Sequence, residues 1–337
     1  MAEIIKLNVE TQDFFEGLLD GSADIARKYV AMARKGDLAK TDKGGRSDGN
    51  PVTLADTEIQ QYIYDRLYGN EAKGINPSRF KDAGFLGEEE NEILRPKNPS
   101  GNYPQLRFVV DPLDGTKPFT IGHNHWTVCN FALQQSDAEG KEWKTVISGA
   151  YSPEKDIAVL ADNERVIVRS YGWFGDHRYH PLTELRPTPV HSAESGPDGQ
   201  PPQLKGKHLD LRLVSHDKAQ AELWQDLQQK GFTVRNAGPI AATFLEFLAG
   251  KPGEFSIIAG KPGGEWDWRA AEHFLTQAGF KAELVTYKGM DAKGKDYPAF
   301  IAAGDPQVFE YLKRRLGQTL ERQKGQSAGA GSAVRVA

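Results

Sequence analysis

Residues 106–119, LRFVVDPLDGTKPF, decide how the rest of the chain is interpreted. The apolar run at residues 106–110 contains two β-branched valines, which is typical of a buried strand. Pro112 has no amide proton to donate to a sheet, so the strand is expected to stop there. Gly115 permits a tight turn and leaves its amide bare. The stretch therefore predicts a buried strand that ends abruptly in a polar turn.

The polar turn has the composition of a phosphate and metal site. Two carboxylates, Asp111 and Asp114, stand three residues apart, and the Thr116 hydroxyl follows them. Carboxylates are hard oxygen ligands suited to Mg²⁺, and exposed amides at a turn suit phosphate. Metal-assisted phosphoryl chemistry is one interpretation of this pattern. An acidic surface turn without function is the other.

Composition limits the class of protein. A chain of 337 residues predicts about two domains, and a hydrophobic content of 39% supports a sizeable core. The net charge of −4 provides no basic excess for a nucleic acid polymer. The single cysteine, Cys129, precludes an internal disulfide and fits a reducing compartment.

The sequence also predicts a cytoplasmic protein with no membrane partner. The N-terminal residues MAEIIKLNVE lack a basic region followed by a long apolar core, so no signal peptide is expected. No apolar run approaches the roughly 20 residues that span a bilayer.

The first half of the chain combines helices with a run of strands. Helices are predicted over residues 11–34 and from Thr53 onward. Strands with the pattern of an antiparallel meander are predicted at residues 126–135, 145–152, 156–161 and 165–170.

The second half alternates strands and helices, which favours an α/β layer. Its predicted strands are 209–215, 232–235, 255–259, 281–286 and 299–302, and its predicted helices are 217–230, 240–249, 267–278 and 306–323. The domain boundary is placed within residues 176–207, with a surface insertion at 195–203. The expected domains are an α+β metal-binding domain at 1–180, an α/β domain at 181–324 that completes the site, and a disordered tail at 325–337.

Other acids along the chain have ordinary explanations when taken singly. Glu88 and Glu89 form a loop pair that is usually just solvated. Asp56 falls in the first turn of a predicted helix, where it would stabilise the helix dipole. Asp267 follows a glycine-rich segment and has the position of a helix N-terminal acid.

Taken together and in order, these motifs resemble the inositol monophosphatase superfamily. The motifs are Thr53-x-x-Asp56, Gly87-Glu-Glu, Asp111-Pro-Leu-Asp-Gly-Thr and Trp266-Asp267, and the resemblance runs from Pro51 to Gly279. It implies an Mg²⁺-dependent, lithium-sensitive phosphatase of small phosphorylated metabolites. It also implies a layered αβαβα sugar-phosphatase fold, two or three Mg²⁺ ions, and a homodimer, since family members are often dimers.

The resemblance assigns a role to each candidate residue. It implies that Glu88, Asp111 and the Leu113 carbonyl bind a first metal and that Asp111, Asp114 and Asp267 bind a second. It makes Asp56 and Thr116 the pair that orients the nucleophilic water. The Gly115 and Thr116 amides would hold phosphate oxygens, and Glu89 would support the metal ligands from behind.

Motif details favour the 3′(2′),5′-bisphosphate nucleotidase (CysQ-like) branch, which removes the 3′-phosphate of 3′-phosphoadenosine 5′-phosphate. Lys117, Glu265 and the segment Leu213–His216 resemble that branch. Residues 120–125, TIGHNH, depart from it, and residues 238–244 lack the lysine that it often has.

The residues that contact the remote part of the substrate are less well defined. Gly260 stands where the inositol branch normally has a glutamate, which counts against inositol 1-phosphate. Ser215, His216 and Lys261 are the candidates for substrate contacts, and exposed loop positions explain them equally well. His123 and His125 are close enough in sequence to bind a metal that prefers imidazole, although the acids already supply hard ligands.

Two other functions remain open at this point. A sugar (bis)phosphate or inositol monophosphate phosphatase would use the same metal core. A non-catalytic protein that binds a phosphorylated metabolite belongs to a different class, and the complete set of acids speaks against it.

Overall fold

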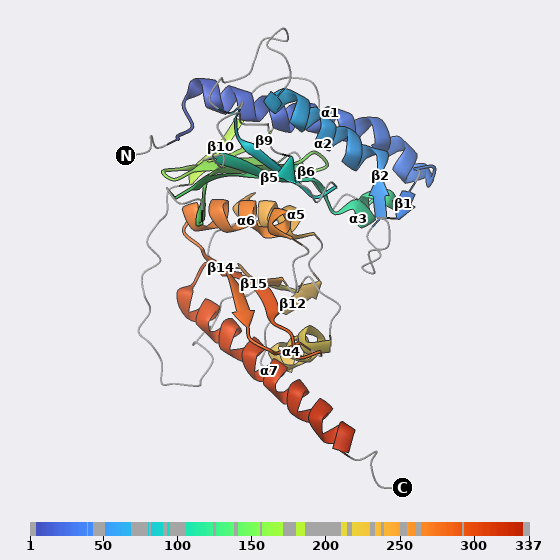
Figure 1. The fold of residues 1–337 in the computed structure, drawn as a ribbon, viewed down its shortest axis with the longest axis vertical. Helices are drawn as coiled ribbons and strands as arrows, with labels where there is room; N and C mark the ends of the chain where they lie inside the picture. The colour runs from blue at the N-terminus through green and yellow to red at the C-terminus, as the bar shows by residue number, and fades with distance from the viewer. Residues whose placement is uncertain are drawn as a thin grey trace. The chain divides into compact units, whose positions relative to one another are not determined.

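A computed structural model gives the fold (Figure 1). It describes residues 5–38, 40–42, 51–68, 80, 82–89, 93–94, 106–123, 126–137, 141–155, 157–170, 180–185, 210–213, 218–229, 233–236, 239–249, 255–259, 264–291 and 293–332. The chain forms two compact units. The first contains residues 1–187, 238–250 and 263–278, and the second contains residues 188–237, 251–262 and 279–337.

The first unit is built on an eight-stranded sheet. In spatial order its strands are β10 (His180–Leu185), β9 (Val166–Ser170), β8 (Ile157–Asp162), β7 (Trp143–Ser152), β6 (Thr127–Ser136), β5 (Leu106–Asp114), β3 (Gly84–Gly87) and β4 (Ile93–Leu94). Strands β5 to β9 pair antiparallel in sequence order, which confirms the predicted meander. Strand β3 pairs parallel to β5 and antiparallel to β4. A separate hairpin joins β1 (Lys40–Asp42) to β2 (Pro51–Thr53).

Helices cover both faces of this sheet. On one face lie α1 (Val9–Lys35) and α2 (Leu54–Tyr68), and on the other lie α5 (Ile240–Ala249) and α6 (Glu265–Gln277) (Figure 1). Helix α1 begins at an Asn8 cap, whose side chain accepts a hydrogen bond from the Thr11 amide at 2.9 Å. The Phe15 ring of α1 stacks on Phe131 of β6 with ring centroids 5.0 Å apart. Aromatic packing thus fixes α1 against the sheet.

The second unit has a five-stranded sheet of its own. Its order is β12 (Thr233–Asn236), β11 (Asp210–Leu213), β13 (Phe255–Ala259), β15 (Tyr297–Ala303) and β14 (Lys281–Tyr287). The first three strands are parallel, and β15 pairs antiparallel with both of its neighbours. Helices α4 (Lys218–Gln229) and α7 (Pro306–Ser332) share a buried core with this sheet, including Leu223 and Phe309. The predicted alternation of strands and helices is confirmed, with bounds that differ by a few residues.

Helix α7 is longer than expected. The sequence predicts a helix that ends near residue 323 and a disordered tail at 325–337, whereas the helix continues to Ser332. Residues 325–332 include three glycines and two serines, which are poor helix formers, so no local pattern predicts the extension. Residues 333–337 lie outside the described part of the chain.

Strand β5 does not stop at Pro112, so that prediction is wrong. The strand continues to Asp114 and pairs with β6 as far as Asp114 and Thr127. On its other side, pairing with β3 ends at Val110. Pro112 therefore lies where β5 has only one neighbour, and the missing amide proton breaks no ladder.

The segment expected to carry the domain boundary contains a strand that the sequence did not predict. Strand β10 forms at residues 180–185 and pairs with β9 across a register shift. The predicted insertion at 195–203 lies outside the described residues, and the division into domains at residue 180 stays a prediction. The contacts add that α5 and α6 belong with the first unit. Within the described residues, every helix is too short or too polar to cross a bilayer.

Candidate metal centre

The end of β5 delivers the two central acids and then turns sharply. Asp111 is almost fully buried, with 2% of its surface exposed, and its Oδ1 accepts a hydrogen bond from the Leu113 amide at 3.0 Å. Gly115 has φ of 94°, a left-handed conformation that most other residues adopt only with strain. Helix α3 (Thr116–Thr120) starts directly after it. The glycine thus places Thr116 within one turn of both acids.

Parallel pairing places Glu88 beside Asp111. In the register of β3 with β5, Gly87 lies opposite Val110. The Glu88 amide then donates to the Val110 carbonyl at 3.0 Å, which extends the pairing by one residue. The next residue on each strand is an acid, so the two acids meet at one edge of the sheet.

Helix α6 brings the third acid from the other end of the sequence. The Gly264 amide donates to Asp267 Oδ2 at 3.1 Å, so this carboxylate also caps the start of its own helix. On the sheet side, Asn130 Nδ2 donates to the Trp266 carbonyl at 3.0 Å. The residue next to Asp267 is therefore tied to β6, the strand that pairs with β5.

These three acids form one cluster. One carboxylate oxygen from each of Glu88, Asp111 and Asp267 lies within 4.8 Å of the other two. Oxygens on opposite sides of one Mg²⁺ ion lie about 4.2 Å apart, so a small contraction brings the three to ligand distance. Burial raises the pKa of Asp111 well above its ordinary value, and the charges of Glu88 and Asp114 raise it further. A cation would relieve this repulsion.

Asp114 has a second function in the fold. Its Oδ2 accepts a hydrogen bond from the Ala241 amide in the first turn of α5, at 2.6 Å. Burial raises the pKa of Asp114 to about 8, followed by the charge of Asp267. Asp114 thus lies in the electrostatic field of the cluster, while one of its oxygens binds the positive end of a helix.

Asp56 and Thr116 are joined directly. The Thr116 hydroxyl donates to Asp56 Oδ1 at 2.8 Å, across 60 residues of sequence. On its other oxygen, Asp56 accepts from the Thr53 amide at 2.8 Å and the Thr53 hydroxyl at 2.5 Å. Asp56 is fully buried, and that burial raises its pKa to about 6. The pair is a carboxylate held in place and hydrogen-bonded to a hydroxyl at the edge of the acidic cluster.

Comparison with known proteins agrees with this arrangement. A sequence model described as the inositol monophosphatase family matches residues 11–135. The SuhB extragenic suppressor protein of Bartonella henselae shares the fold over 91% of this chain and 98% of its own, with a TM-score of 0.61 and 18% identity. An IMPase of Thermotoga maritima matches 93% of this chain and 99% of its own, with a TM-score of 0.61 and 16% identity. Residues 11–135 thus match the inositol monophosphatase family, and the chain as a whole shares the fold of these solved structures. The predicted α/β fold of the αβαβα type is thereby confirmed.

Two further relatives resemble the chain at low identity or over a short segment. CysQ of Bacteroides thetaiotaomicron matches 89% of this chain and 99% of its own, with a TM-score of 0.53 and 19% identity. A protein of Chlorobaculum parvum named histidinol-phosphatase is 36% identical over 77 residues. That match covers 23% of this chain and 24% of the relative, so the chain matches about a quarter of this relative's length.

The acidic cluster fits the metal dependence that is general in the inositol monophosphatase family. All three donors are carboxylates, and among the residues the structure describes no histidine or cysteine joins them. Hard oxygen donors of this kind suit Mg²⁺ or a similar cation better than a metal that prefers nitrogen or sulfur. His123 is not part of the cluster and lines a small pocket with Phe119 and Trp126, and His125 is outside the described residues.

The remaining predicted site residues have mixed outcomes. The Leu113 carbonyl oxygen lies 3.1 Å from the Thr116 hydroxyl oxygen, and the Glu89 amide donates to Gln60 Oε1 at 3.2 Å. Both residues are near the cluster, and their roles stay predictions. Ser215, His216 and Lys261 lie outside the described residues.

Two residues that shape the centre were not predicted from the sequence. Asn130 anchors α6, and Arg107 of β5 forms an ion pair with Glu265 of α6 at 2.7 Å. An arginine inside the apolar run LRFVV was the available signal, because a charge in a buried strand usually has a partner. That partner is 158 residues away along the chain, which no local pattern reveals.

Proposed function

We propose that the protein is an Mg²⁺-dependent phosphomonoesterase that hydrolyses a small phosphorylated metabolite. The proposal depends above all on one observation: three carboxylates from distant parts of the sequence meet within 4.8 Å, and the strand that carries Asp111 leads directly into Thr116, which binds Asp56. Such a cluster is costly unless a cation binds it. Its proposed ligands are Glu88, Asp111, Asp114 and Asp267, with the Leu113 carbonyl.

The metal ions, when bound, would activate a water molecule and stabilise the charge on the phosphate. The protein's own task is positioning and proton transfer. The Gly115 and Thr116 amides, at the start of α3, would hold two phosphate oxygens. Thr116 Oγ would accept a hydrogen bond from the attacking water while its own proton remains on the Asp56 side.

The proton balance of this step is simple. The water oxygen forms a bond to phosphorus, and the bond from phosphorus to the ester oxygen breaks. One water proton passes through Thr116 Oγ toward Asp56, and the departing ester oxygen takes up a proton from solvent. Burial places the pKa of Asp56 near 6, so it can accept a proton close to neutral pH.

The proposed substrate is a 3′(2′),5′-bisphosphate nucleotide, with AMP as the product from 3′-phosphoadenosine 5′-phosphate. Lys117 and Glu265 support this choice through the resemblance to that branch, and a CysQ protein is among the structural relatives. Ser215, His216 and Lys261 are proposed to contact the remote part of the substrate. Inositol monophosphates and sugar bisphosphates are alternatives on the same metal core. Histidinol phosphate is another, because a relative of that name shares 36% identity over 77 residues.

A phosphate-release assay tests the proposal. Metal-free protein is incubated with each of 3′-phosphoadenosine 5′-phosphate, inositol 1-phosphate, fructose 1,6-bisphosphate and histidinol phosphate, with and without Mg²⁺. We expect Mg²⁺-dependent release that is fastest with the nucleotide and is inhibited by Li⁺. Faster release from another substrate would reassign the specificity and leave the phosphatase proposal intact.

A binding protein without catalysis is the alternative of another class. It predicts that the same compounds bind in the presence of Mg²⁺, as detected by calorimetry, while none releases phosphate. The proposed cytoplasmic location and homodimer are tested separately, by fractionation and by light scattering.

A further inference from the structure

We propose that Arg107 and Glu265 form a clamp that positions Asp267 for metal binding. This inference depends on the proposed function, because it assigns a task toward the metal that the phosphatase would use. It concerns residues outside the acidic cluster itself.

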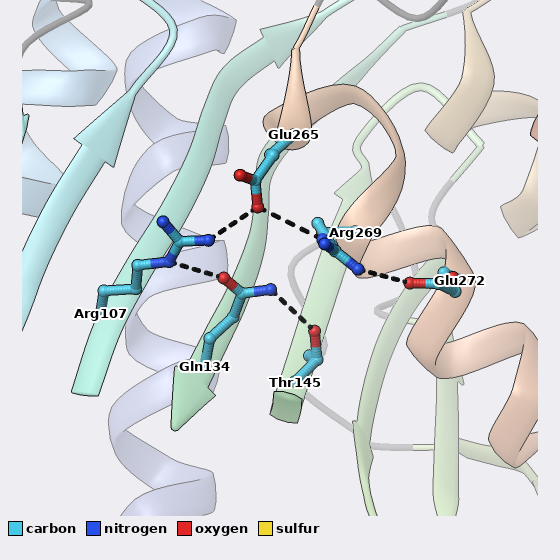
Figure 2. Close-up of polar contacts among 6 residues, drawn as sticks. All are labelled: Arg107, Gln134, Thr145, Glu265, Arg269 and Glu272. Carbon is cyan, nitrogen blue, oxygen red and sulfur yellow. Dashed lines mark hydrogen bonds and ion pairs between the residues drawn. The ribbon is translucent and has the colours of Figure 1, made fainter. Parts of the chain in front are cut away.

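The clamp begins with Arg107, which is held from three directions. Its Nη2 donates to Glu265 Oε2 at 2.7 Å, and its Nε donates to Gln134 Oε1 at 2.8 Å (Figure 2). Its guanidinium carbon lies 4.5 Å from the centre of the Trp143 ring. Only 12% of the Arg107 side chain is exposed, so the guanidinium is fixed by the sheet.

Glu265 is the first residue of α6 and precedes Asp267 by two positions. The oxygen that binds Arg107 also accepts from Arg269 Nε at 3.3 Å, one turn further along the helix. Arg269 in turn donates to Glu272 at 3.2 Å (Figure 2). One carboxylate oxygen therefore links strand β5 to the first turn of α6, where Asp267 lies.

A second link holds the other neighbour of Asp267. Asn130 is fully buried and donates to the Trp266 carbonyl, and in the register of β5 with β6 it lies directly opposite Asp111. The preceding residue, Cys129, has φ of 51°, an unusual conformation for a residue other than glycine. The pairing of β6 with β7 shifts register at this point. The strained bulge redirects Asn130 toward α6, so Glu265 and Trp266 are both tied to the strands beside Asp111.

These links act against a repulsion. Glu88, Asp111 and Asp267 are like charges that repel when no cation is bound, and α6 is the element that would move away. An ion pair and an amide hydrogen bond hold its first turn in place. The fold therefore holds the acids together before the metal binds. Less of the metal's binding free energy is used to bring them together, so its affinity is higher.

The direction in which Mg²⁺ affinity changes when Arg107 is replaced distinguishes a positioning role from a simple electrostatic one. Arg107 is a cation near a cation site, so its removal would strengthen Mg²⁺ binding if long-range charge alone mattered. Positioning predicts the opposite. We expect Arg107→Gln to raise the Kd for Mg²⁺ by about 10-fold, as is typical when residues that orient metal ligands are lost.

The experiment measures Mg²⁺ binding by isothermal titration calorimetry on metal-free protein, with no substrate present. The variants are Arg107→Gln, Arg107→Lys, Glu265→Gln and the double variant Arg107→Gln/Glu265→Gln. The matched control is Glu272→Gln, which makes the same chemical change on the same helix and removes a carboxylate that binds Arg269 instead of Arg107. We expect the control to change the Kd less than twofold, and the double variant to lose no more than the larger single loss. Arg107→Lys should fall between wild type and Arg107→Gln.

Each result of the titration either supports or contradicts the clamp. Unchanged or tighter Mg²⁺ binding in Arg107→Gln, with only a lower melting temperature, would overturn the clamp. Equal losses in Glu265→Gln and Glu272→Gln would also overturn it, because they would indicate a general charge effect. Clamp-dependent Mg²⁺ binding in a wild-type protein that releases no phosphate would support the clamp and contradict the proposed phosphatase.

Discussion

Strand β5 brings together two regions with opposite electrostatic designs. Near its start, Arg107 meets Glu265, Arg269 and Glu272 in a network of alternating charges (Figure 2). At its end, Asp111 faces other carboxylates, and both its burial and their charges raise its pKa. The first region neutralises itself. The second gathers negative charge and is incomplete without a cation.

This difference separates a polar network that supports the fold from one that serves a ligand. A buried network costs little when each charge has a partner within it. A cluster of like charges lowers stability, and a protein retains such a cluster where it binds something. Both regions share β5 and α6, so substitutions in each can be compared within one scaffold. The predictions below test that comparison.

The largest effect is expected for Asp111→Asn. The change removes the central ligand of the cluster, and we expect phosphatase activity to fall by about 10³-fold or more. The stability of the metal-free protein should stay equal or rise, because a buried charge that repels its neighbours is lost. Phosphate release and urea unfolding without metal measure the two effects. Glu89→Gln is the control and should cost far less activity, and Mg²⁺-dependent turnover retained in Asp111→Asn would contradict the assignment of the cluster.

A smaller loss of phosphatase activity is expected for substitution of Thr116, which follows the acids of the cluster in sequence and binds Asp56. Thr116→Val keeps the shape and removes the hydroxyl, so we expect kcat to fall by about 10²-fold to 10³-fold. The Kd for Mg²⁺ should change little, because no carboxylate is lost. Thr116→Ser should recover most of the rate. A Val variant whose Mg²⁺ affinity falls as much as its rate would indicate that Thr116 supports the metal instead of the water.

The acidic region should also determine how stability varies with pH. The pKa of Asp56 is raised to about 6 and that of Asp114 to about 8, both above the ordinary value of 3.8. The stabilising effect of their protonated forms is complete below about pH 4 and is lost as pH rises through the folded-state pKa values. The metal-free protein should therefore be less stable near pH 8.5 than near pH 5.5, by about 1–3 kcal/mol.

Urea unfolding at the two pH values measures this difference. Added Mg²⁺ should reduce it, since the cation replaces the protons, and Asp114→Asn should flatten the dependence on pH. Greater stability at the higher pH in metal-free protein would show that the acids are paired with cationic groups after all.

Parts of both regions could be predicted from the sequence, because local patterns determine them. The valine-rich run predicts β5, and helix α5 has the bounds that its apolar pattern predicts, Ile240–Ala249. Asp111 lies in the last part of β5, so its place near the end of a strand was also predictable. Gly115 has the left-handed backbone that the predicted turn requires.

What could not be predicted depends on distant neighbours. Strand β5 continues through Pro112 because β3 ends earlier, which is a property of another strand. The unusual φ of Cys129 is imposed by the sheet and has no local signal, since cysteine does not favour that conformation. The ion pair of Arg107 with Glu265 likewise exists only in the folded chain.

The smallest effect is expected at His273, a neutral group on α6 that belongs to neither charged region. Its Nδ1 lies 2.8 Å from Ser148 Oγ, and its Nε2 lies 3.3 Å from Asn163 Oδ1. Because Asn163 Oδ1 only accepts, Nε2 carries the proton and Nδ1 accepts from Ser148. Burial lowers the pKa of His273 to about 4, from an ordinary 6.5. Its contribution to stability is therefore present above about pH 6.5 and is lost as pH falls toward 4.

We expect His273→Gln to lower the free energy of unfolding by about 1–2 kcal/mol near pH 7.5, because the buried Ser148 hydroxyl loses its partner. The difference in free energy of unfolding between wild type and variant should be smaller near pH 5. At that pH the imidazole gains a proton when the wild-type protein unfolds, which lowers the stability of the wild type but not of the variant. Urea unfolding at both pH values measures this difference. The pH-dependent contribution of the acids is the same in both proteins and therefore cancels. The Kd for Mg²⁺ should stay unchanged, since Ser148 and Asn163 hold the body of α6 and the Arg107–Glu265 clamp holds its first turn. A gap that widens as pH falls would mean that His273 is charged in the folded protein, and a weaker Mg²⁺ affinity would mean that the whole helix, and not its first turn, sets the position of Asp267.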